Sequence, residues 1–361
     1  MNPSPWPEGN ALVYCEGAFN TTNGKTAHGL VRFTHRYRVV GVIDSRLAGR
    51  DAGQVLDDRP AGIPIYANLH DALASAERKH SSVSHFVIGL APDGGRLQAA
   101  DRRAVKAAVE AGLNVDAGLH DFLSEDPEIA ALAQGKGVVL RDIRKPPHRK
   151  ELHFFSGKIE KVDALKIALL GTDSAIGKRT SAWLLVQAFN DHGCRAELIG
   201  TGQTAWLQGT RYGIILDSLI NDFVSGEIEH AVWSAWEAQH PEVIVIEGQG
   251  SLMNPAYPGG FEILAAGRPD VVLLQHAPAR REYDGFPGYA LHPLPLQIQA
   301  IELISGKPVV AITVNHENLA PDAIPAACES IRQETGLPAF DLLTQGAQGL
   351  VEVIDAHLNR R

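Results

Sequence analysis

A lysine follows a glycine-bounded loop near the middle of the chain, where the backbone could hold a phosphate group. Residues 167–170 form a short apolar run, and the loop extends from Gly171 to Gly177. Lys178 comes next, and an apolar segment at 182–189 could form a helix. Because backbone N–H groups and helix N-termini attract anions, this order of strand, loop, lysine and helix predicts phosphate binding. The residues expected at the phosphates are Gly171, Thr172, Asp173, Ser174, Gly177, Lys178, Arg179 and Thr180.

This loop differs from the usual P-loop at the position that binds magnesium. Five residues separate Gly171 from Gly177, one more than in the usual motif. Arg179 stands where a Ser or Thr hydroxyl normally binds Mg²⁺, and Thr180 is one position further, about 100° around a helix. The residue pattern therefore argues against Mg²⁺ as a cofactor without excluding it. The sequence predicts no other metal site.

More polar residues follow other predicted strands of the same half. One strand ends at Glu247 before a glycine-rich turn, and another precedes Asp217 and Asp222. Ligands of open α/β sheets bind where the strands end, so we expect these residues to converge on one site. The polar stretch at 200–204 also follows a strand, and we interpret it as a loop of the site or a turn. The further candidates are Gln249, His276, Arg280, Arg281, Tyr283 and Asp284.

Strands and helices alternate along the whole chain, which predicts an α/β protein with parallel sheets. The charged, proline-containing stretch at 144–150 interrupts this alternation. We therefore expect a Rossmann-like α/β domain at 1–150 and a P-loop NTPase-like parallel-sheet domain at 151–361. Strands are expected at 11–15, 39–44, 85–91, 138–142, 166–170, 195–199, 212–216, 243–246, 271–275 and 309–314, and helices at 97–111 and 349–358.

Three features of the first half have two interpretations each. Lys25 follows Asn23-Gly24, which is either a second phosphate loop or, more simply, a turn. Asp44 ends a strand, where an acid binds a ribose in many Rossmann folds or caps the next turn. The neighbours His120 and Asp121 could form a catalytic pair, but adjacent residues rarely face each other, which favours an ordinary loop.

Several segments of the second half resemble one P-loop family. The loop GTDSAIGK is similar to that of dethiobiotin synthetase, which carries the same extra residue, and EVIVIEGQGSL resembles the second motif of those synthetases. Over most of the chain the sequence is closer to a family that includes the D-glutamate N-acetyltransferases, long catalogued as a domain of unknown function. Its motifs resemble GTDSAIGKRTS, RYGIILDSLINDFVSGEIEHA, EGQGSLMNPAY and HAPARREYDGFPGY.

The resemblance implies acetyl transfer from acetyl-CoA to the amine of D-glutamate, and the D configuration comes from the family alone. The pyrophosphate of coenzyme A would suit the loop, and Arg179 adds charge for a second phosphate. Acyl transfer also needs a base, a clamp for the acceptor and donors for an oxyanion. We expect the base to be Glu247 or Asp222, and oxyanion donors among the amides of 248–250. The expected substrate contacts are Gln249, Arg280, Arg281 and Tyr283.

Two other classes of function stay open. One is an ATP-dependent ligase or kinase similar to dethiobiotin synthetase, which would join a carboxylate to an amine. Arg179 argues against this function unless Thr180 or Asp173 binds the metal ion. A non-catalytic nucleotide sensor would bind a nucleotide tightly without turnover. Free thiol release from acetyl-CoA and ADP release from ATP distinguish the three hypotheses.

Composition excludes several other classes of protein. A formal charge of −9 argues against non-specific nucleic-acid binding. There is no apolar run of 18 residues, and the N-terminus MNPSPWPEGN lacks the features of a signal peptide. The 3 cysteines are too far apart for a zinc site or a disulfide framework. We therefore expect a cytoplasmic protein that binds neither membranes nor nucleic acids. Its expected partners are small-molecule substrates and further copies of itself in a homo-oligomer.

Overall fold

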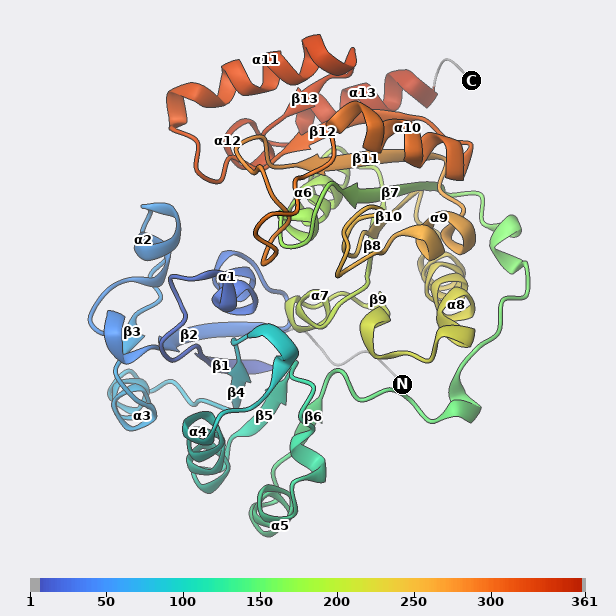
Figure 1. Cartoon of the computed structure of the whole chain (residues 1–361). Coiled ribbons are helices and arrows are strands. Elements are labelled where there is room, and N and C mark those ends of the chain that lie inside the picture. Colours follow the sequence, from blue (N-terminus) through green and yellow to red (C-terminus); the bar gives the residue numbers. More distant parts are fainter. Residues whose placement is uncertain (1–6, 359–361) are drawn as a thin grey trace. The chain divides into compact units, whose positions relative to one another are not determined.

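The computed structural model describes residues 7–358, and the chain divides into two compact units (Figure 1). The first unit contains Met1–Pro146 and Gln203–Thr210, and the second contains Pro147–Gly202 and Arg211–Arg361. The main division falls between two prolines inside the charged stretch at 144–150. The expected second domain, 151–361, included Gln203–Thr210, which the structure assigns to the first unit. Part of the N-terminal stretch used to argue against a signal peptide, residues 1–6, lies outside the described residues.

The first unit is built on a six-stranded parallel sheet in the order β3-β2-β1-β4-β5-β6. This is the strand order of Rossmann folds, in which the direction of winding reverses beside the first strand. The strands are β1 (Gly9–Tyr14), β2 (Tyr37–Ile43), β3 (Ile65–Tyr66), β4 (His85–Ile88), β5 (Asn114–Ala117) and β6 (Leu140–Asp142). The helices are α1 (Lys25–Arg32), α2 (Ala52–Asp57), α3 (Leu69–Arg78), α4 (Ala99–Glu110) and α5 (Pro127–Lys136).

Helix α7 (Gln203–Gln208) completes this unit, although it comes from the second half of the sequence. The Arg36 guanidinium lies 3.6 Å from the centre of the Trp206 ring. The hydroxyls of Thr26 and Thr204 are 2.9 Å apart, and the Gln208 amide donates to two carbonyl oxygens at the end of α1. The polar stretch at 200–204 is therefore not only a loop, as expected, but contains the start of a buried helix. The chain passes between the units three times.

The second unit is a seven-stranded parallel sheet in the order β13-β12-β11-β7-β10-β8-β9. Helices cover it, so its central strands are apolar on both faces. The strands are β7 (Leu165–Gly171), β8 (Ala196–Gly200), β9 (Tyr212–Gly213), β10 (Val243–Glu247), β11 (Val271–His276), β12 (Val309–Val314) and β13 (Ala339–Phe340). The helices are α6 (Lys178–Asp191), α8 (Asn221–Gln239), α9 (Phe261–Gly267), α10 (Leu294–Ser305), α11 (Ile324–Thr335), α12 (Leu342–Gln345) and α13 (Gln348–Leu358).

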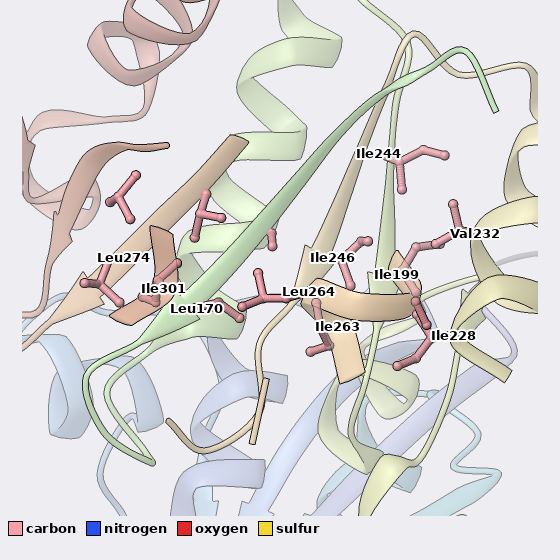
Figure 2. Packing of buried hydrophobic residues seen from close by; sticks show 14 of the residues in the cluster. Leu170, Ile199, Ile228, Val232, Ile244, Ile246, Ile263, Leu264, Leu274 and Ile301 are labelled. Carbon is pink, nitrogen blue, oxygen red and sulfur yellow. The ribbon is translucent and has the colours of Figure 1, made fainter. Parts of the chain in front are cut away.

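The main core cluster of the second unit joins its sheet to helices α8, α9, α10 and α11. Figure 2 shows Ile244 and Ile246 of β10 in one cluster with Ile228 of α8 and Ile263 of α9. These side chains are 0% exposed. Full burial of an aliphatic side chain contributes roughly 1.5–3 kcal/mol to the free energy of folding. β10 and its neighbours therefore hold the loops at their carboxyl ends in stable positions.

The expected α/β fold with two parallel sheets is confirmed, with differences at short strands. The strand expected at 212–216 ends at Gly213, and Leu216 begins a 3₁₀ turn. Strands β3, β5 and β13 were not expected, because each is only two to four residues long. Within residues 7–358, no helix is long and apolar enough to cross a membrane.

The ambiguous features of the first unit have structural roles. Asp44 is buried, and its carboxylate accepts from the N–H groups of Phe19 and Arg46, so it caps the following 3₁₀ turn. Lys25 begins α1 directly after a 3₁₀ turn that ends at Gly24. These placements correspond to the cap and turn interpretations.

His120 and Asp121 do not face each other. The Asp121 carboxylate accepts from the N–H of Leu97 at 2.7 Å and pairs with Arg96 at 2.8 Å. The His120 ring instead contacts the guanidinium of Arg144. The pair therefore forms two separate loop contacts rather than a dyad.

Candidate active site

The phosphate loop connects β7, the central strand of the second unit, to the N-terminus of α6. Gly177 is the N-cap of α6 and has φ +93°, a conformation that favours glycine. A Cβ on Gly171 would lie 2.8 Å from Cδ of Lys178 and 3.0 Å from its Nζ. The two glycines thus serve different purposes: Gly177 turns the chain into the helix, and Gly171 leaves room for the lysine to cross the loop.

Lys178 is buried and ties the phosphate loop to the loop after β10. Its Nζ donates to the carbonyl oxygens of Asp173 at 2.6 Å and Gly250 at 2.8 Å. Arg179 and Thr180, which follow it, are half-buried. The first turn of α6 therefore holds two cations close to the loop, and they add to the attraction of the helix N-terminus for anions.

Asp173 is the centre of a network that holds four segments together. Its side chain is 0% exposed. One carboxylate oxygen accepts from the N–H of Ser174 and the amide of Asn254, both at 2.7 Å. The other accepts from Arg280 at 2.8 Å and from the N–H of Asp284 at 2.9 Å. The residue was expected to contact phosphates, but here its carboxylate holds the loops after β10 and β11 against the phosphate loop. Arg280 adds the loop after β12 to the network through Glu317.

Glu247 ends β10 and is a buried carboxylate beside the cations of the phosphate loop. One of its oxygens accepts from the N–H of Thr201 at 2.9 Å, and the Thr201 hydroxyl donates to the Glu247 carbonyl oxygen. Burial raises the pKa of Glu247 above its ordinary value, although the charges of Arg179 and Lys178 oppose the shift. A buried carboxylate with a raised pKa takes up a proton more readily, which suits a general base.

The turn after Glu247 contributes amide groups at the same edge. The N–H of Gly248 donates to the carbonyl oxygen of Leu169 at 2.9 Å and continues the pairing of β10 with β7. It is therefore not available to an oxyanion, contrary to the expectation for residues 248–250. The Gln249 side chain donates to the Thr201 hydroxyl at 3.0 Å. The main-chain amides of Gln249 and Gly250 are the remaining candidates in this turn.

His276 ends β11 and faces the phosphate loop. Its Nδ1 lies 3.0 Å from the hydroxyl of Thr172. Burial, with the charges of Arg280 and Arg281, lowers the pKa of His276 from 6.5 to about 4. The imidazole is thus neutral at physiological pH and can orient Thr172 without adding charge.

The two arginines after β11 have different surroundings. The guanidinium of Arg280 forms a two-point contact with Glu317 at 2.7 and 2.8 Å in addition to its contacts with Asp173 and the Ser174 carbonyl. Its side chain is only 11% exposed, so it organises the loops instead of presenting the expected open clamp. Arg281 is exposed, and its charge acts on His276.

The other expected residues are placed less centrally. Tyr283 is buried, and its hydroxyl lies 2.7 Å from Nδ1 of His292. Asp222 is exposed in the first turn of α8, where a negative charge suits the helix N-terminus. In the described part of the chain, no hydrogen bond or ion pair joins Asp222 to Glu247, and of the two expected bases only Glu247 lies beside the charges of Lys178 and Arg179.

Two residues of the network, Asn254 and Glu317, were not among the predicted site residues, whereas Thr201 lies in the stretch at 200–204 that was interpreted as a loop of the site or a turn. Asn254 and Glu317 lie on different loops, and their partners are 81 and 37 positions away in the sequence. Asn254 lies within EGQGSLMNPAY, one of the segments that resemble family motifs, and that was its one available signal. Among residues 7–358, no group of three or more His, Cys, Asp or Glu side chains has an arrangement that could hold a metal ion.

Family models match both units. The model for the DUF1611 C-terminal P-loop domain, a domain of unknown function, matches residues 153–351. The model for the DUF1611 N-terminal Rossmann-like domain, also of unknown function, matches residues 45–146. The chain belongs to the DUF1611 family. The family resemblance seen in the motifs is thereby confirmed.

Two curated relatives of the chain carry an enzyme name. The chain is 30% identical over 286 residues to a protein of Tritonibacter scottomollicae named D-glutamate N-acetyltransferase, covering 78% of this chain and 84% of the relative. It is 31% identical over 273 residues to a Pseudoalteromonas protein of the same name, covering 74% and 80%. A crystal structure of a DUF1611 protein from Anabaena variabilis matches with a TM-score of 0.88 at 28% identity, covering 97% of this chain and 100% of that one.

Proposed function

We propose that this DUF1611 protein is an N-acetyltransferase that moves an acetyl group from acetyl-CoA to the amine of D-glutamate. Two relatives of about 30% identity bear that enzyme name, and they match most of the chain. The phosphate loop suits the pyrophosphate of coenzyme A, since Lys178 and the N-terminus of α6 lie at its mouth. Arg179 replaces the magnesium-binding hydroxyl, which favours a thioester donor over ATP.

The observation that carries the proposal is the position of Glu247. Its carboxylate is buried at the end of β10, next to the strand that leads into the phosphate loop. A thioester is already activated, so the main requirement is to remove a proton from the acceptor ammonium. Glu247, with a pKa raised by burial, is the group that we assign to that step.

The chemical steps balance with groups of this chain. Glu247 takes one proton from the D-glutamate ammonium, and the freed amine attacks the thioester carbonyl carbon. A C–N bond forms while the main-chain amides of Gln249 and Gly250 stabilise the oxyanion. The C–S bond then breaks, and the thiolate takes the second amine proton to leave as coenzyme A. Arg281 binds a carboxylate of the acceptor and orients its amine.

The test follows thiol release from acetyl-CoA in the presence of D-glutamate, L-glutamate or no acceptor. We expect release with D-glutamate and loss of about 10²-fold or more in kcat for Glu247→Gln. Glu197→Gln is the matched control, because burial also raises the pKa of Glu197 on the neighbouring strand β8. Thiol release that is independent of any acidic amino acid, together with ADP release from ATP, would favour the ligase hypothesis instead.

A further inference from the structure

Three aromatic residues, two of them exposed and one half-buried, stand on the two loops that Asp173 holds. We call Tyr257, Phe286 and Tyr289 the aromatic rim. Tyr257 is 51% exposed and Tyr289 is 58% exposed, values that are high for large aromatic side chains. The ring centres of Tyr257 and Phe286 are 6.3 Å apart, and those of Phe286 and Tyr289 are 6.4 Å apart, both edge to face. The rim is thus one cluster assembled from two loops.

The first rim loop is fixed to the phosphate loop through Asn254. The amide nitrogen of Asn254 donates to Asp173, and its oxygen accepts from the N–H of Tyr257 at 2.8 Å. The carbonyl oxygen of Tyr257 accepts from the N–H of Ser251, the residue after Gly250, which Lys178 contacts. Tyr257 is therefore hydrogen-bonded to the residue that follows Gly250, the contact of Lys178.

The second rim loop is fixed through Asp284, whose N–H donates to Asp173 at 2.9 Å. The N–H of Tyr283 donates to the Tyr289 carbonyl, and the N–H of Phe286 donates to the Tyr283 carbonyl, both at 3.0 Å. This short hairpin presents the two aromatic rings beside Tyr257. A buried carboxylate in the phosphate loop thus sets the position of all three rings.

The chemistry of the rim suits a flat, uncharged ring. The segments NPAYPG at 254–259 and GFPGYA at 285–290 contain no charged side chain. Aromatic side chains that keep a face in water favour stacking with a base, whereas phosphates are bound by the N–H groups and lysine of the loop below. A ligand with a phosphate at the loop and an aromatic ring at the rim is a nucleotide.

We propose that the aromatic rim binds the adenine ring of the acyl donor. This inference rests on the proposed function, in which coenzyme A occupies the phosphate loop. The reacting thioester must reach Glu247, and the adenine lies at the opposite end of the donor. The exposed rim is a suitable place for that end, and it sets the preference of the enzyme for coenzyme A over shorter pantetheine thioesters.

The test compares acetyl-CoA with S-acetyl-4′-phosphopantetheine, which keeps the arm and one phosphate but lacks the adenosine. For Tyr257→Ala and Tyr289→Ala, we expect the KM for acetyl-CoA to rise about tenfold, the size of one lost stacked base, with kcat unchanged. The KM for S-acetyl-4′-phosphopantetheine should stay at its wild-type value. Tyr289→Phe should restore binding because it keeps the ring. Phe155→Ala, at an exposed aromatic of the segment that precedes β7, is the control.

Other outcomes overturn the inference. Equal increases in the KM for both donors would place the pantetheine arm at the rim. An increase only in the KM for D-glutamate would place the acceptor there, and an unchanged KM for all three would show that the rim is not part of the site. A smaller oligomer of the variants than of the wild type on gel filtration would make it a subunit interface. If the wild-type protein releases no thiol, the proposed function fails. Calorimetry with coenzyme A and ADP then still tests the rim proposal, and equal affinities of wild type and Tyr289→Ala for these ligands would overturn it.

Discussion

The Asp173 carboxylate and the Arg280 guanidinium form an ion pair with an O–N distance of 2.8 Å inside the second unit. The two residues are 107 positions apart, and Asp173 is 0% exposed. Arg280 also contacts Glu317 with two nitrogens, so one guanidinium joins the loops after β7, β11 and β12. This arrangement makes Arg280 a residue that shapes the site, and Arg281 is the arginine that we propose for substrate binding.

We expect Arg280→Met to destabilise the protein by about 3 kcal/mol, because it leaves the buried Asp173 charge without its ionic partner. Urea unfolding of the purified variant measures the change. Arg268→Met is the matched control: its pair with Glu160 is more than half exposed on both sides and should contribute under about 1 kcal/mol. Equal losses for the two variants would contradict the role assigned to the Asp173 network.

Lys178→Ala should weaken binding of coenzyme A about tenfold or more, since a charged hydrogen bond contributes roughly 1.5–3 kcal/mol. The fold should survive, because the two carbonyl oxygens that Lys178 contacts lie in loops held by other bonds. Calorimetry with coenzyme A measures the affinity, and circular dichroism checks the fold. Lys161→Ala changes an exposed lysine of the same unit and serves as the control. An unchanged affinity would remove Lys178 from the phosphate site.

Stability should depend on pH through His276. Its pKa is about 4 in the folded chain and 6.5 by its ordinary value, so the unfolded chain binds more protons between these pH values. The free energy of unfolding therefore falls as the pH is lowered from 6.5 to 4, by at most about 1.4 kcal/mol per pH unit. His276→Gln should flatten this part of the pH–stability curve, whereas His192→Gln at the surface should not. Parallel curves for wild type and His276→Gln would refute this assignment.

The long apolar strands and the phosphate loop could be predicted from the sequence because their signals are local. Residues 243–246 are all β-branched, residues 309–314 are β-branched except for Ala311, and each run is a strand in the structure. β5 was missed because its sequence NVDA is short and contains Asp116, whose buried carboxylate is paired with Arg141 and Tyr37. A hydrophobic pattern cannot reveal a buried charge whose partners are distant in sequence.

Individual residues of the site could be predicted from the sequence, but the hydrogen bonds and ion pairs between them could not. Lys178 and Glu247 could be found because each follows a strand, and all strands end at one edge. The role of Asp173 could not be found, since three of its four partners lie 81 to 111 positions away. That α7 belongs to the first unit could not be predicted for the same reason, because Trp206 and Arg36 are 170 positions apart in the sequence.

Trp206→Ala should destabilise the first unit selectively. The ring packs against the buried Arg36, whose Nε also donates to the Trp206 carbonyl at 2.9 Å, so the variant leaves a cavity beside a buried charge. We expect a loss of about 2–4 kcal/mol. Hydrogen exchange should then become faster in β1, β2 and β4 and stay unchanged in β7 and β10. Trp236→Ala, at a half-buried tryptophan of the second unit, should give the reverse pattern, and uniform protection in both units would contradict the assignment of α7.

Arg281→Met should raise the KM for D-glutamate about tenfold while the KM for acetyl-CoA stays near its wild-type value. Arg281 is exposed, and its charge acts on His276 at the end of β11, so its guanidinium is placed to bind a carboxylate by charge-assisted hydrogen bonds. A loss confined to acceptor binding appears in KM and not in kcat when the bond is equally strong in the ground and transition states. Arg332→Met, in an exposed pair with Glu329 on α11, is the control. If the KM for acetyl-CoA rises as much as that for D-glutamate, Arg281 belongs to the donor site, and the acceptor clamp must lie elsewhere.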